Sequence, residues 1–206
     1  MFTDDVLTFA RGALPPPPAR VLEIGAGSGE LAAELANSGY DVVAIDPASE
    51  TPGVRPIALI DVTEPPHSFD AAVAVVSLHH VEPLAPSCKR LAELVRPGGN
   101  LVVDEFDVER FDERAARWLL AHRDSRHDHE PRTPAEVIEF LRHHVHPLST
   151  VRAALEAGGF SLDGVVRGPY LHRWDLPPGL QPEEERLVKG GKLKATGARF
   201  SGRAAS

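Results

Sequence analysis

The chain has 206 residues, enough for one substantial hydrophobic core, and its 42% hydrophobic and 25% charged composition is typical of a globular protein. The net charge of -8, from 22 basic and 30 acidic side chains, argues against a surface that binds the nucleic-acid backbone. Cys88 is the single cysteine, which excludes an internal disulfide and fits a reducing compartment. We find neither a signal-peptide pattern nor an apolar run long enough for a bilayer, so we expect a cytoplasmic protein without membrane contact.

Strand and helix patterns alternate along the chain, which predicts a doubly wound α/β sheet. The predicted strands are residues 20–24, 42–45, 56–60, 69–76, 100–105, 160–166 and 195–201. The predicted helices are residues 3–13, 30–37, 84–94, 112–122, 134–144 and 149–157. Because the links after the second and third strands are short, we expect reduced or missing helices there. The stretch 177–191, which contains an acidic run, is predicted to be a loop.

The glycine turn between the first strand and its helix, Gly25–Gly29, is the most informative motif. Glycines without side chains permit a tight turn and a close approach of a ligand to the backbone. Glu23 lies before the turn and Glu30 directly after it. These carboxylates suit a ligand with positive charge better than a pyrophosphate. Alternatively, Glu30 is only a first-turn acid that interacts with the helix dipole.

Acidic residues follow the next two predicted strands. In open α/β sheets, ligands bind beyond the carboxyl ends of the strands, where the strand order reverses. Asp46 lies about twenty residues past the glycines, the spacing at which an acid accepts hydrogen bonds from ribose hydroxyls. Asp61 can accept a hydrogen bond from an adenine amino group, with Val62 packed on the ring. The sequence therefore predicts a cofactor that contains adenosine.

Two such cofactors compete. A nicotinamide dinucleotide favours the pattern G-x-G-x-x-G/A, but here the third glycine comes one position early and Glu30 occupies the last place. S-adenosylmethionine carries a sulfonium and an amino group and no phosphate, so Glu23 and Glu30 do not oppose it. The motif therefore favours S-adenosylmethionine, and a nicotinamide-dependent oxidoreductase is the disfavoured alternative.

Together these motifs resemble those of the class I S-adenosylmethionine-dependent methyltransferases, in their small-molecule branch. Val21–Glu30 is similar to the glycine-rich motif of that family, Asp46 to its ribose acid and Asp61-Val62 to its adenine site. Residues 69–81 resemble the fourth-strand motif, and residues 94–103 resemble the helix, turn and strand that follow it.

The resemblance implies a Rossmann-like, seven-stranded, mostly parallel sheet whose last strand, assigned to residues 195–201, is antiparallel. It implies S-adenosylmethionine as cofactor and S-adenosylhomocysteine as product. The cofactor-binding residues that we predict are Glu23, Gly25, Ala26, Gly27, Gly29, Asp46, Pro47, Asp61, Val62, Ser77, Leu78 and His79.

Composition changes after Asp107, and we interpret residues 110–148 as a helical cap inserted into a single domain of residues 1–206. Six of the ten histidines lie between His122 and His146. Adjacent histidines on a helix point about 100° apart, so we predict no metal site and favour a lid over the acceptor. The motifs considered as metal ligands were His127-Asp128-His129-Glu130 and His143-His144-Val145-His146. The aromatic residues that can stack on an acceptor, or simply pack, are Trp118, Tyr170 and Trp174.

Methyl transfer depends mainly on alignment of the acceptor, which can also need a base that titrates near neutral pH. The predicted catalytic residues are His79, His80 and Glu105. For the two histidines, the alternatives are packing under the cofactor and helix capping. The nucleic-acid amino-methylating enzymes of the family have Asp/Asn-Pro-Pro-Tyr/Phe where this chain has Ser77–His80, which favours a small acceptor.

We therefore predict S-adenosylmethionine-dependent methylation of a small molecule, such as a natural product or a quinone-like compound, at an oxygen, nitrogen or carbon atom. The alternative is a non-catalytic protein that binds an adenosyl ligand or regulates a partner and keeps the methyltransferase fold. The sequence predicts no nucleic-acid partner.

Overall fold

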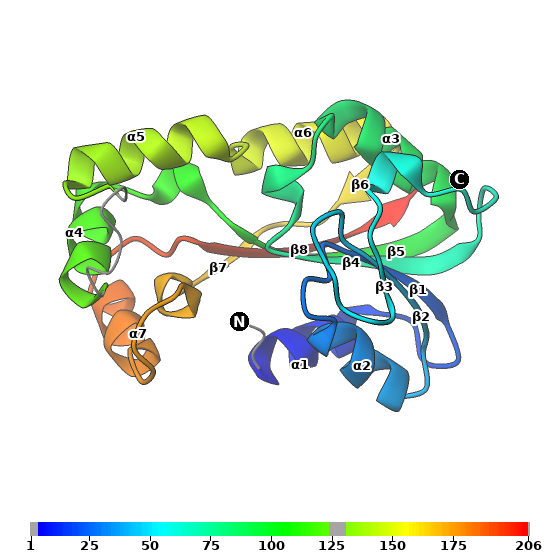
Figure 1. Ribbon diagram of the computed structural model, residues 1–206, viewed down its shortest axis with the longest axis horizontal. Coiled ribbons are helices and arrows are strands. Elements are labelled where there is room, and N and C mark those ends of the chain that lie inside the picture. The colour runs from blue at the N-terminus through cyan, green and yellow to red at the C-terminus, as the bar shows by residue number, and fades with distance from the viewer. Residues whose placement is uncertain (1–3, 124–130, 206) are drawn as a thin grey trace.

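One twisted sheet organises the computed structural model, which describes residues 4–123 and 131–205 (Figure 1). Its eight strands in the described residues follow the order β3-β2-β1-β4-β5-β8-β6, and β7 also pairs with β8. The strands are β1 (Arg20–Ile24), β2 (Asp41–Ile45), β3 (Val54–Arg55), β4 (Phe69–Val75), β5 (Val95–Phe106), β6 (Phe160–Leu162), β7 (Val166–Gly168) and β8 (Gly197–Ala204). Neighbours among β1 to β5 are parallel, and β8 is antiparallel to β5. The prediction of a doubly wound, mostly parallel sheet with an antiparallel last strand is confirmed.

Helices cover both faces of the sheet, with α1 and α2 on one side and α3 and α6 on the other (Figure 1). The α-helices are α1 (Asp4–Ala13), α2 (Glu30–Asn37), α3 (Leu84–Leu94), α4 (Glu113–His122), α5 (Pro134–His144), α6 (Leu148–Gly158) and α7 (Gln181–Lys189). The short 3-10 helices are η1 (Leu59–Asp61), η2 (Leu78–His80), η3 (Val108–Arg110) and η4 (Leu171–Arg173). Helices α4, α5 and α7 lie together at the left end of Figure 1, beyond the sheet. Among the described residues, no helix combines the length and apolar character needed to cross a bilayer.

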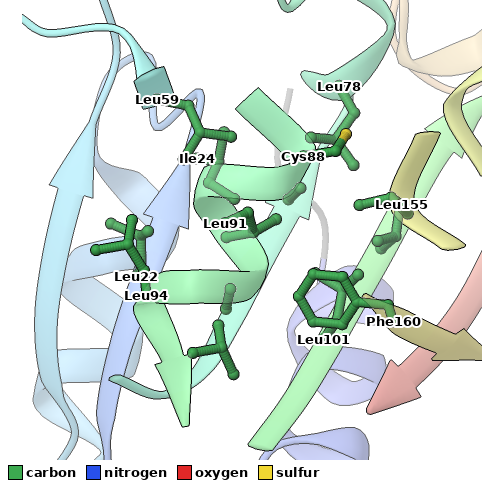
Figure 2. Close-up of a cluster of buried hydrophobic side chains, with 14 of the residues drawn as sticks. Leu22, Ile24, Leu59, Leu78, Cys88, Leu91, Leu94, Leu101, Leu155 and Phe160 are labelled. Carbon is green, nitrogen blue, oxygen red and sulfur yellow. The ribbon is translucent and has the colours of Figure 1, made fainter. Parts of the chain in front are cut away.

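The alternation of side chains along β1 divides the core between the two faces of the sheet. Leu22 and Ile24 belong to the cluster under α3 and α6, which Figure 2 shows with Leu91 and Leu155. Val21 belongs to the cluster under α1 and α2. Because both faces are covered, the interior strands are almost continuously apolar, as parallel sheets require.

Local capping signals fix the helix ends where the sequence predicted them. Thr133 and Glu136 form a capping box at the start of α5, and Pro134 occupies its first turn. Gly39 follows α2 with a φ of 92°, a left-handed conformation that favours glycine and stops the helix. The prediction of reduced helices after the second and third strands is confirmed, because η1 is the one helical element described between β2 and β4.

The strand predicted at residues 56–60 is wrong. The edge strand β3 ends at Arg55, because Pro56 has no N–H to donate to a β-ladder. The chain then turns, with Ile57 N donating to Arg55 O at 2.8 Å, and continues into η1. Asp61 therefore ends a 3-10 helix rather than a strand.

Two other predictions about the C-terminal part need correction. The stretch 177–191 is not a loop, since it contains α7, whose acidic first turn and basic last turn complement the helix dipole. The sheet has eight strands in the described residues rather than seven, because the segment predicted as one strand at 160–166 forms β6 and β7. Asp163 interrupts it by accepting a hydrogen bond from Ser201 Oγ at 2.6 Å.

A separate hydrophobic cluster forms the cap. Trp118 and Leu119 of α4 pack there with Val137 of α5 and with Leu171 and Leu193 from the C-terminal part. The insertion predicted at 110–148 therefore shares its core with η4 and α7, which lie outside that range. The single-domain boundaries remain a prediction.

Candidate functional site

The glycine turn after β1 brings the ends of two strands together. Gly25 has a φ of +70°, and a Cβ on it would lie 2.2 Å from the Cβ of Ser77, which follows β4. Gly27 has a φ of +51°, and nothing lies within 4 Å of the place where its Cβ would be. Gly25 therefore permits close packing of the turn, whereas Gly27 leaves open space above it.

Two cavities meet at this turn, and Gly25 and Val76 line both of them. Val76 has a φ of 53°, a left-handed conformation that is strained for a β-branched residue and that clusters at functional sites. Sequence reasoning did not single out Val76, because nothing in the apolar run of β4 signals a positive φ at its end.

The first cavity, of about 520 Å³, lies beyond the carboxyl ends of β1 and β2. Asp46 lines it, and its carboxylate accepts hydrogen bonds from Gly27 N at 2.9 Å and Ala48 N at 2.8 Å. These bonds fix the acid, and each oxygen keeps capacity for a further donor. The wall of this cavity also includes Pro47, Ile57, Ala58, Leu59, Ser77 and His80.

Two residues predicted for adenine lie elsewhere. Asp61 is exposed and does not line the first cavity, and Val62 is 2% exposed and packs in the core. The apolar wall of that cavity comes instead from Ile57, Ala58 and Leu59. Their apolar character was visible in the sequence, but we assigned part of this segment to a strand.

The second cavity, of about 400 Å³, holds two buried charged side chains with open hydrogen-bonding positions. Glu23 is 3% exposed, and its Oε2 atom has no hydrogen-bond partner among the described residues. Burial raises the pKa of Glu23 to about 8, so the carboxyl is mostly protonated at neutral pH. Arg173 also lines this cavity, with a side chain that is 6% exposed.

Glu105 supports the turn that follows β4. It is fully buried, and its Oε1 accepts hydrogen bonds from Ser77 N at 3.0 Å and Leu78 N at 2.6 Å. Its Oε2 lies 2.5 Å from Nδ1 of His79. Glu105 thus positions η2.

The two histidines of η2 have different surroundings. His79 is 5% exposed and lines neither cavity. His80 is exposed and lines the first cavity. Burial of its ring and the neighbouring His79 lower the pKa of His80, against a hydrogen bond to the backbone of His144. His80 is therefore neutral at pH 7.

An aromatic cluster adjoins the second cavity, whose wall includes Tyr170. The ring of Phe106 lies 5.2 Å from the rings of both Tyr170 and Trp174, measured between centroids. Trp118 lies in the cap and donates a hydrogen bond to Glu183 at 3.0 Å.

The histidines of the cap bind protein groups. His143 and His144 each contact the backbone carbonyl four residues earlier, at 2.7 Å. His146 lies 2.9 Å from Glu82. In the described part of the chain, no three His, Cys, Asp or Glu side chains are placed to hold a metal ion, and residues 127–130 lie outside that part.

Comparisons with known proteins match the region that contains the glycine turn and the first cavity. A family model described as a methyltransferase domain matches residues 2–163. An uncharacterized methyltransferase of Mycobacterium tuberculosis is 37% identical over 98 residues, covering 43% of this chain and 40% of that protein. A demethylmenaquinone methyltransferase of Beutenbergia cavernae is 38% identical over 102 residues, covering 45% of this chain and 42% of that protein. The chain thus spans less than half of the length of either relative.

The fold has close structural counterparts. The solved structure of an S-adenosylmethionine-dependent methyltransferase from Mesorhizobium loti aligns with a TM-score of 0.61. The alignment covers 94% of both chains at 18% identity, so the similarity is one of fold.

Proposed function

Because this chain belongs to the methyltransferase-domain family, we propose that it transfers the methyl group of S-adenosylmethionine to a small-molecule acceptor. The family match confirms the resemblance to class I S-adenosylmethionine-dependent methyltransferases that the motifs indicated. The observation that carries the proposal is the pair of cavities that meet at Gly25, one with a fixed acid and apolar walls and one with the open carboxyl of Glu23.

The first cavity suits the nucleoside. Asp46 is held by two backbone N–H groups and can accept hydrogen bonds from the ribose hydroxyls. Ile57, Ala58 and Leu59 offer an apolar surface for the adenine ring. The roles predicted for Asp61 and Val62 remain predictions.

The second cavity suits the amino-acid end. The buried Oε2 of Glu23 lacks a partner among the described residues, and an ammonium group would satisfy it. When bound, S-adenosylmethionine supplies a methyl group activated by a positively charged sulfur. The protein's part is to hold that cofactor, align the acceptor and exclude water.

The acceptor that we propose is planar and largely apolar. The cluster of Phe106, Tyr170 and Trp174 beside the second cavity supports this, since aromatic side chains stack on flat rings. The name of the Beutenbergia relative, a demethylmenaquinone methyltransferase, also supports a quinone-like class. For an acceptor atom that carries a proton, we assign its removal to His80, which is neutral at pH 7 and lines the first cavity four residues after Val76, a residue of both cavities.

Calorimetric titration with S-adenosylmethionine, S-adenosylhomocysteine and NAD tests the cofactor. The two adenosyl ligands should bind, and Asp46→Ala should weaken both by about tenfold or more through the loss of charge-assisted hydrogen bonds. Asp41→Ala is the matched control, because Asp41 is an exposed acid at the other end of β2. Tighter binding of NAD, or an unchanged dissociation constant in Asp46→Ala, would contradict the proposal.

The protonation of Glu23 gives a second readout. Since the pKa of Glu23 is about 8, a cation that binds beside it at pH 7 should release about one proton. Titrations in buffers with different ionisation enthalpies measure that number. Glu23→Gln should remove the release, whereas Glu30→Gln should keep it. A release that is equal in both variants would show that the cation does not meet Glu23.

Transfer of a labelled methyl group to a panel of quinone-like and other small metabolites separates an enzyme from a non-catalytic binding protein. His80→Gln should lower the rate constant by about a hundredfold for an acceptor that loses a proton, measured at saturating cofactor because His80 also lines the nucleoside cavity. Binding of the cofactor without transfer to any metabolite would favour the non-catalytic alternative.

A further inference from the structure

The wall of the second cavity carries a positive group as well as the carboxyl of Glu23, and this group lies outside the residues that the family model matches. Arg173, the last residue of η4, has its side chain almost completely buried on the cavity wall. Its Nε atom is buried and has no hydrogen-bond partner among the described residues. We propose that Arg173 binds the carboxylate of the amino-acid end of the cofactor, an inference that rests on the proposed function.

The guanidinium group is held by two neighbours, neither of which accepts a hydrogen bond from its Nε atom. Its Nη1 donates a hydrogen bond to Asp104 at 2.7 Å, and its Cζ lies 5.0 Å from the centre of the Tyr170 ring. Asp104 is shared, because Arg199 also donates to it at 2.6 Å. Arg199 in turn also pairs with Asp5, so what Arg173 keeps open is its unused donor, Nε.

Glu184 sets the position of the turn that carries Arg173. It is fully buried on α7, and its Oε1 accepts hydrogen bonds from Tyr170 N at 2.7 Å and Leu171 N at 2.9 Å. Its Oε2 accepts one from His172 N at 2.9 Å and lies 2.7 Å from His172 Nδ1. Every residue of the turn before Arg173 is thus tied to one carboxylate, which makes Glu184 a positioning residue for the site.

An α-amino acid matches both open atoms of this cavity. The carboxyl of Glu23 suits the ammonium group, and a guanidinium group donates to a carboxylate through paired N–H groups. A purely cationic ligand would leave Arg173 without an acceptor, whereas an α-amino acid pairs its carboxylate with Arg173 and its ammonium group with the ionised form of Glu23. The cavity is therefore built for a zwitterion, with its two charges recognised by residues from opposite ends of the chain.

Three adenosyl ligands that lose one group at a time test this inference in the intact protein. These are S-adenosylmethionine, decarboxylated S-adenosylmethionine and 5′-methylthioadenosine, which lacks both the amino and the carboxylate groups. The wild-type protein should bind S-adenosylmethionine about tenfold or more tightly than the decarboxylated form, because a charge-assisted hydrogen bond is lost. Arg173→Gln should bind the two equally and should bind 5′-methylthioadenosine as the wild type does.

A matched variant separates this effect from general damage. Arg167→Gln makes the same change in β7 at an arginine that pairs with Asp107 and does not line the second cavity. It should keep the preference for the carboxylate, and thermal melting should show that both variants are folded. Glu184→Gln should reduce the preference partly, because the turn loses its support while Arg173 is still present.

The possible failures are distinguishable. Equal binding of S-adenosylmethionine and its decarboxylated form by the wild type would overturn the role of Arg173 and leave the proposed function standing. A preference for the carboxylate that survives in Arg173→Gln would overturn it as well. Failure of the wild type to bind any of the three ligands, including 5′-methylthioadenosine, would overturn the proposed function itself.

Discussion

Two short turns at the candidate site, η2 and η4, are built in the same way in different parts of the molecule. Both turns contain the dipeptide Leu-His, which follows Ser77 in η2 and Tyr170 in η4. In each, a fully buried glutamate accepts hydrogen bonds from two successive backbone N–H groups through one oxygen and meets Nδ1 of the histidine through the other. A single carboxylate thus satisfies donors that a 3-10 turn leaves unpaired.

The two turns differ in where the glutamate lies. Glu105 belongs to β5, which has β4 and β8 on its two sides and helical layers above and below. Glu184 belongs to the first turn of α7, at the end of the molecule beyond the sheet (Figure 1). A buried glutamate can therefore hold a 3-10 turn either from a central strand or from a peripheral helix, and we expect its removal to affect stability differently in the two places.

Removal of each glutamate should have the largest effect. Glu105→Ala leaves three backbone N–H groups and His79 without their acceptor inside the sheet, and should lower the free energy of unfolding by about 3–5 kcal/mol. Glu184→Ala should cost less, about 2–3 kcal/mol, since α7 lies at the end of the molecule beyond the sheet, where local rearrangement relieves part of the loss (Figure 1). Urea unfolding followed by circular dichroism measures both. An equal or larger loss in Glu184→Ala would break the comparison.

Each turn also packs on a glycine, which offers a test of intermediate size. Gly25→Ala should cost about 3 kcal/mol, because the new Cβ would lie 2.2 Å from Ser77 Cβ and the φ of +70° disfavours alanine. Gly197→Ala should cost about 1–2 kcal/mol, because its Cβ would lie 2.9 Å from Pro169 O and 3.3 Å from Tyr170 Cβ. Thermal unfolding ranks the two. The reverse order would show that η4 is the more tightly packed turn.

The smallest effect that we expect is on acid stability. Although burial opposes it, hydrogen bonds from His172 and from the backbone of Tyr170 and Leu171 lower the pKa of Glu184 below its ordinary value of 4.5. A lowered pKa in the folded state gives stability that is present above pH 4.5 and is lost as the pH falls below it. Glu184→Gln should therefore show a shallower loss of unfolding free energy below pH 4.5 than the wild type. Identical slopes for the two proteins would mean that Glu184 does not contribute.

The sequence by itself predicted the parts of the site that depend on local pattern. Apolar runs located β1, β2, β4 and β5, and the carboxyl ends of parallel strands meet at one edge, so the glycine turn and Asp46 were placed together correctly. The capping box of α5 and the glycine after α2 were also visible, because these signals act within a few residues.

Tertiary structure decided everything that depends on contacts between distant segments. Glu105 supports η2 through its hydrogen bonds, and such pairing cannot be read from spacing along a chain; its catalytic role stays a prediction. The acidic run of α7 is typical of a loop by composition, but Glu184 within it is buried and accepts hydrogen bonds from η4. Arg173 carried no local signal, because only folding brings it into contact with Asp104 and Tyr170 and onto the wall of the cavity that Glu23 also lines.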